Sequence, residues 1–191
     1  MSAGGEGRTG RATRLAIELL VVLVAAGIAA VVVQRAVLAV FYIPSASMEP
    51  QLEINDRVAV SKLAYDLHSP RRGDVVVFLA RAEGSQAAGS APTATHQRDL
   101  IKRVVGLPGE TVTGRSGHVW IDNRLLVEPY LPPGTLTSDF GPVRVPPGDL
   151  WVMGDNRSDS TDSRVFGPIS QGSVVGRALW RVWPLDRLAF L

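Results

Sequence analysis

The pattern of hydrophobic positions begins with one long apolar run close to the N-terminus. Residues 15–33 are apolar with the single exception of Glu18. As a helix, about 19 residues span roughly 28 Å, close to the thickness of about 30 Å of a bilayer's hydrocarbon core. The run has no polar face, which argues against a helix buried on one side only. We therefore expect a transmembrane anchor over residues 15–35.

The charges on either side of this run predict its orientation. Three arginines precede the run, whereas only Gln34 and Arg35 follow it directly. The positive-inside rule then makes residues 1–14 a cytoplasmic tail and residues 36–191 an extracytoplasmic domain. A cleavable signal peptide is the alternative, but its apolar core is usually shorter, about 7–15 residues. We expect an anchor that is not cleaved.

Beyond the anchor, the pattern changes to short β-type runs separated by Gly and Pro turns. Residues 118–125 are typical of a small hairpin. No helical stretches stand between the runs, which favours a mostly β, antiparallel domain over a parallel α/β sheet. The sequence predicts strands over residues 57–60, 74–79, 100–105, 119–121, 150–153 and 174–182.

Two segments interrupt this β pattern. Residues 82–97 are rich in Ala, Gly, Ser and Thr, a composition that predicts a mobile loop. Residues from about 113 to 142 contain the hairpin and a stretch rich in Pro and Gly. We expect this second segment to form a small inserted subdomain.

Composition narrows the possible chemistry. The chain has no cysteine, which excludes disulfides, thiolate metal sites and cysteine nucleophiles. Its 20 basic and 18 acidic residues give a net charge of only +2, which argues against a nucleic-acid partner. A calcium loop is one interpretation of the polar segment 154–164, but no glutamate ends it. We expect neither a metal nor an organic cofactor.

Lysine is rare in this chain, which makes its placement informative. Only Lys62 and Lys102 are lysines, and Lys102 stands between Leu100 and Val104 on one face of a predicted strand. Apolar neighbours disfavour the charged ammonium and lower its pKa, and a neutral lysine can act as a general base. The alternative is a strand lysine whose stem packs while its amine reaches water.

A candidate nucleophile lies upstream of this lysine. Ser45 and Ser47 stand between Pro44 and Pro50, which restrain the backbone around them. Together with Lys102 they suggest a serine–lysine hydrolase, a known variant of the serine–histidine–aspartate arrangement. A Ser-x-Ser segment beside a proline is also common in ordinary turns.

Four motifs in a fixed order are similar to those of bacterial type I signal peptidases, the membrane-bound leader peptidases. The resemblance extends from the anchor to residue 185. It implies an antiparallel signal-peptidase-like β domain behind one N-terminal transmembrane helix. The motifs occupy residues 44–50, 72–74, 102–109 and 154–164.

The resemblance also implies a role for each site residue. Ser47 matches the nucleophile and Lys102 the general base. Ser45 matches the serine whose hydroxyl forms the oxyanion hole with the Ser47 N–H, and Ser160 the serine that orients the lysine. Supporting ion pairs are implied for Arg103, Asp155, Asp162 and Arg164. The family commonly has Thr and Asn where this chain has Gln51 and Asp159.

The function implied is removal of N-terminal signal peptides from exported preproteins, after small residues at positions −1 and −3. The implied partners are preprotein signal peptides and the bilayer of a bacterial cytoplasmic membrane. A histidine base is disfavoured because His68, His96 and His118 lie in turn-like or loop contexts. The alternatives are a self-cleaving repressor relative, for which the chain lacks a DNA-binding domain, and an anchored non-catalytic β domain or inactive paralogue that binds protein partners.

Overall fold

The structure is a computed structural model that describes residues 6–80 and 98–191. The chain divides into two compact units, Met1–Leu38 and Ala39–Leu191. The loop predicted over residues 82–97 lies outside the described residues.

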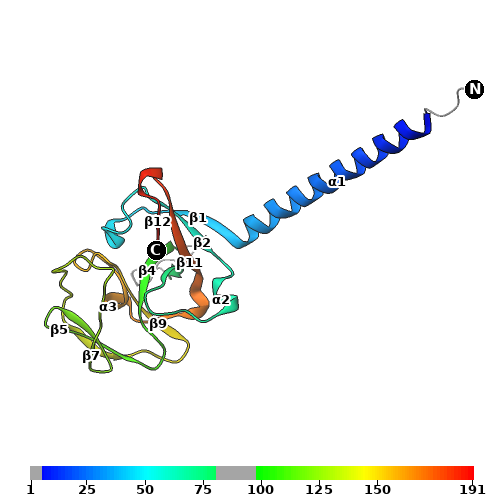
Figure 1. Ribbon diagram of the computed structural model, residues 1–191. Coiled ribbons are helices and arrows are strands. Elements are labelled where there is room, and N and C mark those ends of the chain that lie inside the picture. The colour runs from blue at the N-terminus through cyan, green and yellow to red at the C-terminus, as the bar shows by residue number, and fades with distance from the viewer. Residues whose placement is uncertain (1–5, 81–97) are drawn as a thin grey trace, which may run out of the picture. The chain divides into compact units, whose positions relative to one another are not determined.

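The first unit is the helix α1 (Glu6–Val37), shown in blue in Figure 1. It contains the segment predicted as an anchor and begins well before the apolar run. Among the side chains described, the large apolar ones from Ile17 to Val31 are between 51% and 62% exposed. In the part of the chain that the structure describes, no helix reaches the combination of length and apolar character that a membrane span requires.

The second unit is built from two sheets, which confirms the predicted mostly β, antiparallel class (Figure 1). The larger sheet has the strand order β1-β2-β11-β3-β4-β9-β10, and β12 pairs with β11. All of its pairs from β2 to β10 are antiparallel. The strands are β1 (Leu38–Tyr42), β2 (Arg57–Ser61), β3 (Val75–Ala80), β4 (Arg98–Gly106), β9 (Asp149–Met153), β10 (Ile169–Ser170), β11 (Val174–Trp183) and β12 (Ala189–Phe190).

The smaller sheet has the strand order β7-β6-β5-β8. A two-residue turn joins β6 to β7, and Asp122 and Asn123 both have positive φ, 47° and 64°, as a type I′ hairpin requires. The hairpin predicted over 118–125 is confirmed. The strands are β5 (Thr111–Arg115), β6 (His118–Ile121), β7 (Arg124–Leu125) and β8 (Phe140–Arg144).

The six strands predicted individually are all present, with ends within two residues of those expected. Five strands were missed, namely β1, β5, β8, β10 and β12. Two of these are only two residues long, and β5 and β8 contain glycine or proline, so no clear alternation marks them. β1 continues the apolar composition of α1, so the sequence does not show where the helical period ends and the strand period begins. The remaining elements are short: α2 (Ala64–Leu67), α3 (Ser163–Phe166), and the 3₁₀ turns η1 (Ala46–Met48), η2 (Gln171–Ser173) and η3 (Leu185–Arg187).

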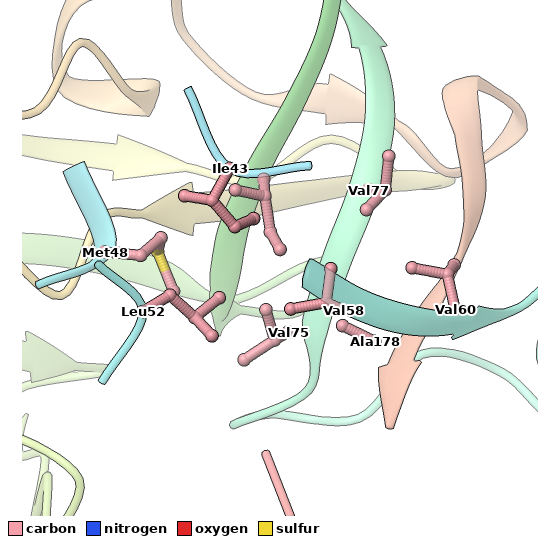
Figure 2. Packing of buried hydrophobic residues seen from close by; sticks show 9 residues of the cluster. Ile43, Met48, Leu52, Val58, Val60, Val75, Val77 and Ala178 are labelled. Atoms are coloured by element: carbon pink, nitrogen blue, oxygen red, sulfur yellow. The ribbon is translucent and has the colours of Figure 1, made fainter. Parts of the chain in front are cut away.

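One core cluster holds the segment that carries the two candidate serines. Met48 and Leu52 are fully buried, and Figure 2 shows both side chains among those of the larger sheet. Burying side chains of this size contributes about 1.5–3 kcal/mol each. The segment that directly follows Ser47 is therefore fixed to the sheet by two buried side chains. The cluster comprises Ile43, Met48, Leu52, Val58, Val60, Val75, Val77, Ile101 and Ala178.

A second cluster joins the two sheets. Trp151 of β9 stacks on Phe140 of β8 with ring centroids 5.3 Å apart. Gly106 lies where the two sheets approach each other closely, because a Cβ there would be 2.5 Å from Val112 Cγ2. The buried members of this cluster are Val105, Val112, Val119, Ile121, Val145, Trp151 and Met153.

Candidate active site

Ser47 lies in the 3₁₀ turn η1 and is almost completely buried. The next residue, Met48, is anchored in the core, so the turn cannot shift without disturbing packing. The loop after β9 holds the same turn from the other side. Asn156 donates from its backbone N–H to Ser47 O (3.1 Å) and from Nδ2 to Ala46 O (3.2 Å).

Lys102 reaches this turn from β4, where it pairs with Val76 of β3. Its Nζ lies 2.7 Å from Ser47 Oγ and donates to Ile101 O at 2.9 Å. The residue is only 3% exposed. The structure thus brings together a serine and a lysine that are 55 residues apart in the chain.

The surroundings of Lys102 change its acidity. Desolvation by burial lowers its pKa from 10.5 to about 8, and the negative charges of Asp162 and Asp155 partly oppose this shift. Leu100 and Val104, the neighbours on its face of the strand, belong to a third apolar cluster. A lysine with this pKa is neutral in a substantial fraction of molecules at mildly alkaline pH, and a neutral amine can accept the proton of a hydroxyl.

Ser45 precedes the turn and is exposed. Its Oγ lies 3.3 Å from Ser47 Oγ, so the two hydroxyls face the same space. A pocket opens at this point, with mostly apolar walls and with Asp99 and Lys102 as its charged residues. It is lined by Phe41, Tyr42, Ile43, Pro44, Ser45, Val77, Asp99, Leu100, Ile101 and Lys102.

Ser160 lies near the serine–lysine pair without the hydrogen bond expected of it. Its Oγ is buried and has no hydrogen-bond partner among the described residues. Lys102 Nζ instead contacts Ser47 Oγ and Ile101 O. Gly154 allows Ser160 to lie close to Ser47, because a Cβ on Gly154 would lie 2.3 Å from Ser160 Oγ and 2.4 Å from Ser47 O.

Arg103 and Asp155 form a buried, two-pronged ion pair. Arg103 Nε donates to Asp155 Oδ1 at 2.8 Å and Nη2 to Oδ2 at 2.7 Å, and both residues are at most 3% exposed. Arg103 also donates from Nη1 to Gly73 O (2.7 Å) and from Nη2 to the side-chain oxygen of Gln51. Gln51 was seen in the sequence only as a departure from the family's usual residue, and nothing in the sequence showed that it contacts Arg103.

Asp162 and Arg164 form the second ion pair, at the start of α3. Arg164 donates from Nε to Asp162 Oδ1 (2.9 Å) and from Nη2 to Oδ2 (2.8 Å). The Gly154 N–H donates to Asp162 Oδ2 at 3.0 Å. Burial on its own would raise the pKa of Asp162, but the hydrogen bonds from Arg164 and Gly154 outweigh it, and the pKa is lowered. Asp162 therefore stays ionised beside the serine–lysine pair.

Three further polar residues adjoin the site without having been predicted. Arg157 Nε donates to Gly154 O at 3.1 Å, and its guanidinium pairs with Glu128. Tyr130 donates from its hydroxyl to Glu128 Oε1 at 2.6 Å and lies against Arg103. Residues 128–130 belong to a loop rich in proline, and no spacing in the sequence connects them to the motifs.

The structure places the histidines as follows. His68 is half-buried with Nδ1 3.0 Å from Ser69 O, and His118 is exposed on β6. His96 lies outside the described residues. Within residues 6–80 and 98–191, no group of three or more His, Cys, Asp or Glu side chains could hold a metal ion.

A buried serine hydroxyl against a desolvated lysine, on an antiparallel β domain, is the arrangement of a serine–lysine hydrolase. The sequence model of one family, described as signal peptidase, peptidase S26, matches residues 16–183. This match covers most of the chain. The chain belongs to the signal peptidase family, peptidase S26.

Two relatives matched by sequence agree with this assignment. A probable signal peptidase I-2 of a Synechocystis species is 37% identical over 177 residues, which cover 92% of this chain and 77% of the relative. The signal peptidase I of Leptolyngbya laminosa is 43% identical over 152 residues, covering 78% and 71% respectively. The crystal structure of a signal peptidase I from Enterococcus faecalis V583 has 32% sequence identity and a TM-score of 0.43, and the match covers 57% of this chain and 96% of that one.

The buried lysine predicts a measurable effect on stability. The unfolded chain keeps its Lys102 proton up to about pH 10.5, whereas the folded protein releases it near pH 8. Between these two values the unfolded state binds more protons, so the free energy of unfolding rises with pH. Below pH 8 the desolvated ammonium destabilises the fold. We expect Lys102→Met to raise the free energy of unfolding by about 1–3 kcal/mol at neutral pH, with the gain shrinking toward pH 10.5.

Urea unfolding of both proteins across this pH range measures the difference. Lys62→Met is the matched control, because Lys62 is exposed and its replacement should leave the stability curve unchanged. A Lys102→Met variant that is less stable than wild type by the same amount at every pH would contradict the desolvation argument.

Proposed function

We propose that this protein is a signal peptidase, a membrane-bound serine endopeptidase that removes N-terminal signal peptides from exported preproteins. The observation that carries the proposal is the distance of 2.7 Å between Lys102 Nζ and Ser47 Oγ, in a site where burial lowers the pKa of the lysine. Membership of the signal peptidase family supplies the substrate class.

In the proposed reaction Lys102 acts first as a base and then as an acid. Neutral Lys102 removes the proton of Ser47 Oγ as this oxygen attacks the scissile carbonyl carbon. The protonated amine then donates this proton to the leaving nitrogen, the peptide bond breaks, and the signal peptide stays esterified to Ser47. Water, deprotonated by Lys102, hydrolyses the ester and regenerates Ser47.

Ser45 is proposed to stabilise the oxyanion of the tetrahedral intermediate together with the Ser47 N–H. The support is the distance of 3.3 Å between the two hydroxyl oxygens. The carbonyl oxygen of a substrate bonded to Ser47 Oγ would lie within reach of the Ser45 hydroxyl. A hydrogen-bond donor of this kind lowers the free energy of a transition state by about 2.7–4 kcal/mol.

One edge of β4 supports the proposal that the site binds an extended peptide. Residues Arg98–Lys102 pair with β3 on one side, whereas the register with β9 begins only at Arg103. In the described part of the chain, this length of β4 therefore has one unpaired edge, which can add a peptide strand through its backbone groups. The apolar pocket beside Ser45 suits the small side chains at −1 and −3.

The remaining motif residues are proposed to support the pair. The ion pairs Arg103–Asp155 and Asp162–Arg164 fix the loop whose Asn156 holds Ser47 and Ala46. Ser160 is proposed to orient Lys102, because a buried hydroxyl without a partner is costly and is rare in proteins. It would accept a hydrogen bond from the ammonium that forms during the reaction.

The anchor and the orientation are also proposals. The apolar run 15–33 and the exposed apolar side chains of α1 support an anchor over residues 15–35. The arginines before it support a cytoplasmic tail of residues 1–14 and an extracytoplasmic domain of residues 36–191 in the bacterial cytoplasmic membrane. Substrates that enter the membrane through their own signal peptides would then reach the same side of the membrane as the site. The proposed reaction needs no cofactor and no nucleic acid.

Purified protein in detergent should cleave a preprotein that carries an Ala-x-Ala site, with the cut confirmed by mass spectrometry. Ser47→Ala should lose at least about a thousandfold in rate because the nucleophile is gone. Lys102→Arg should lose as much, since arginine keeps the charge and cannot act as a base. The control Lys62→Arg makes the same change at an exposed lysine and should stay active. Equal activity of all variants would contradict the serine–lysine mechanism. No activity in any of them, wild type included, would favour a binding function or a missing partner.

The pH dependence of kcat/KM should report the pKa of the base in the free enzyme. The pKa of Lys102 is lowered to about 8, so activity should rise as pH increases through about 8 and level off above it. Activity rises with pH because only the neutral amine of Lys102 accepts a proton. A rate that levels off near pH 6.5, the usual range of histidine, would contradict a lysine base.

The anchor should resist extraction by alkaline carbonate, which removes proteins bound only at the membrane surface. In intact spheroplasts, added protease should digest the domain of residues 36–191, whereas a tag placed before residue 14 should be digested only after lysis. Release of the protein by carbonate, or protection of the β domain in intact spheroplasts, would contradict the proposed topology.

A further inference from the structure

Two buried arginines flank the loop that holds the nucleophile. Arg103 pairs with Asp155 at the beginning of this loop, and Arg157 donates to Gly154 O within it. Asn156 stands between Asp155 and Arg157 and donates to both Ser47 O and Ala46 O. The position of the loop, and with it that of Ser47, therefore depends on how the two guanidinium groups are held.

The aromatic ring of Tyr130 covers the guanidinium group of Arg103. The Arg103 guanidinium carbon lies 4.2 Å from the centroid of the Tyr130 ring. The edge of the guanidinium is already occupied by Asp155, Gly73 O and Gln51. The ring covers a face of the group, where a cation is attracted by the π electrons and water is kept away.

The same short segment also holds the other arginine. The Tyr130 hydroxyl donates to Glu128 Oε1 at 2.6 Å, and Glu128 pairs with Arg157. Arg157 donates further to Thr137 Oγ1 at 2.7 Å. Burial and the nearby Glu128 raise the pKa of Tyr130, so the phenol stays a hydrogen-bond donor over the working range of pH.

We propose that Tyr130 is a positioning residue for the Ser47–Lys102 pair, acting through its contact with Arg103, with Glu128 and Arg157 fixing the far side of the same loop. This inference rests on the proposed peptidase function. Tyr130 makes no contact with the substrate pocket, whose lining does not include it. Its effect should therefore fall on kcat and on the titration of the base, and leave KM largely unchanged.

The direction of the titration effect follows from the charges around Lys102. The carboxylates that act on its ammonium are Asp162 and Asp155, and Asp99 lines the same pocket. Loss of the ring admits water to Arg103 and loosens its pairing with Asp155, whose charge is then less neutralised. Both changes favour the charged ammonium, so the pKa of Lys102 rises. The acidic limb of the pH profile, the range in which activity falls as pH decreases, then moves to higher pH.

The test compares Tyr130→Leu with Tyr130→Phe in the full-length protein in detergent. Tyr130→Leu removes the π face, and we expect kcat to fall about tenfold with KM within about twofold of wild type. Its acidic limb should move to higher pH. Tyr130→Phe keeps the ring over Arg103 but loses the hydrogen bond to Glu128. Its kcat and the pH of its acidic limb should match those of wild type.

Trp120→Leu is the matched control. Trp120 stacks under Arg115 at 4.0 Å in the smaller sheet, so the substitution removes the same kind of contact away from Arg103. Its kcat and pH profile should match those of wild type. Thermal melting checks each variant, and Tyr130→Met replaces Tyr130→Leu if the latter does not unfold cooperatively.

The proposal is overturned if Tyr130→Leu keeps the wild-type kcat and acidic limb, if Tyr130→Phe loses as much as Tyr130→Leu, or if only KM changes. Failure of the proposed function is a different result, in which wild type itself does not cleave the preprotein. The pH at which the free energy of unfolding begins to rise then reports the pKa of Lys102 without a substrate. Tyr130→Leu should move that pH upward, and an unchanged value overturns the positioning role.

Discussion

The buried ion pair between Arg103 and Asp155 is the interaction on which the rest of the site depends. Removing either partner would leave a charge in a nearly dry interior, which typically costs about 3–5 kcal/mol. The pair joins the strand that carries the lysine to the loop that holds the serine. Through Gly73 O and Gln51, the same guanidinium reaches the start of β3 and the segment that follows η1. Four segments distant in sequence thus meet at one side chain.

Arg103 and Lys102 are neighbours in β4, and the strand gives them different environments. The arginine finds a carboxylate, a carbonyl and a side-chain amide, so its charge is fully compensated. The lysine finds one hydroxyl and one carbonyl, with Asp162 and Asp155 acting on it through space. Because desolvation outweighs this attraction, the pKa of the lysine is lowered and the lysine is able to lose its proton. A strand can achieve this because successive side chains point in opposite directions.

The apolar cores set the distances at which these polar groups meet. Met48 and Leu52 attach the segment that carries Ser47 to the larger sheet (Figure 2), and the cluster around Trp151 attaches the smaller sheet to β4 and β9. The absence of a side chain at Gly154 allows the loop after β9 to approach Ser47 O. Close-packed protein interiors move little. The short distance between Ser47 and Lys102 is therefore held by packing more than by the hydrogen bond itself.

The sequence by itself determined the local features of this protein. The apolar run, the strands with clear alternation and the hairpin at Asp122 and Asn123 follow from hydrophobic period and turn chemistry, which depend on near neighbours. Lys102 was singled out by the rarity of lysine and by its apolar neighbours, and Ser47 by the prolines around it, while their roles followed from the motifs and their order. The tertiary structure alone decided which groups meet: Gln51 contacts Arg103, Tyr130 covers the same guanidinium, and the Ser160 hydroxyl has no hydrogen-bond partner among the described residues. These contacts join residues far apart in the chain, and no spacing along one segment records them, because they depend on how the two sheets pack.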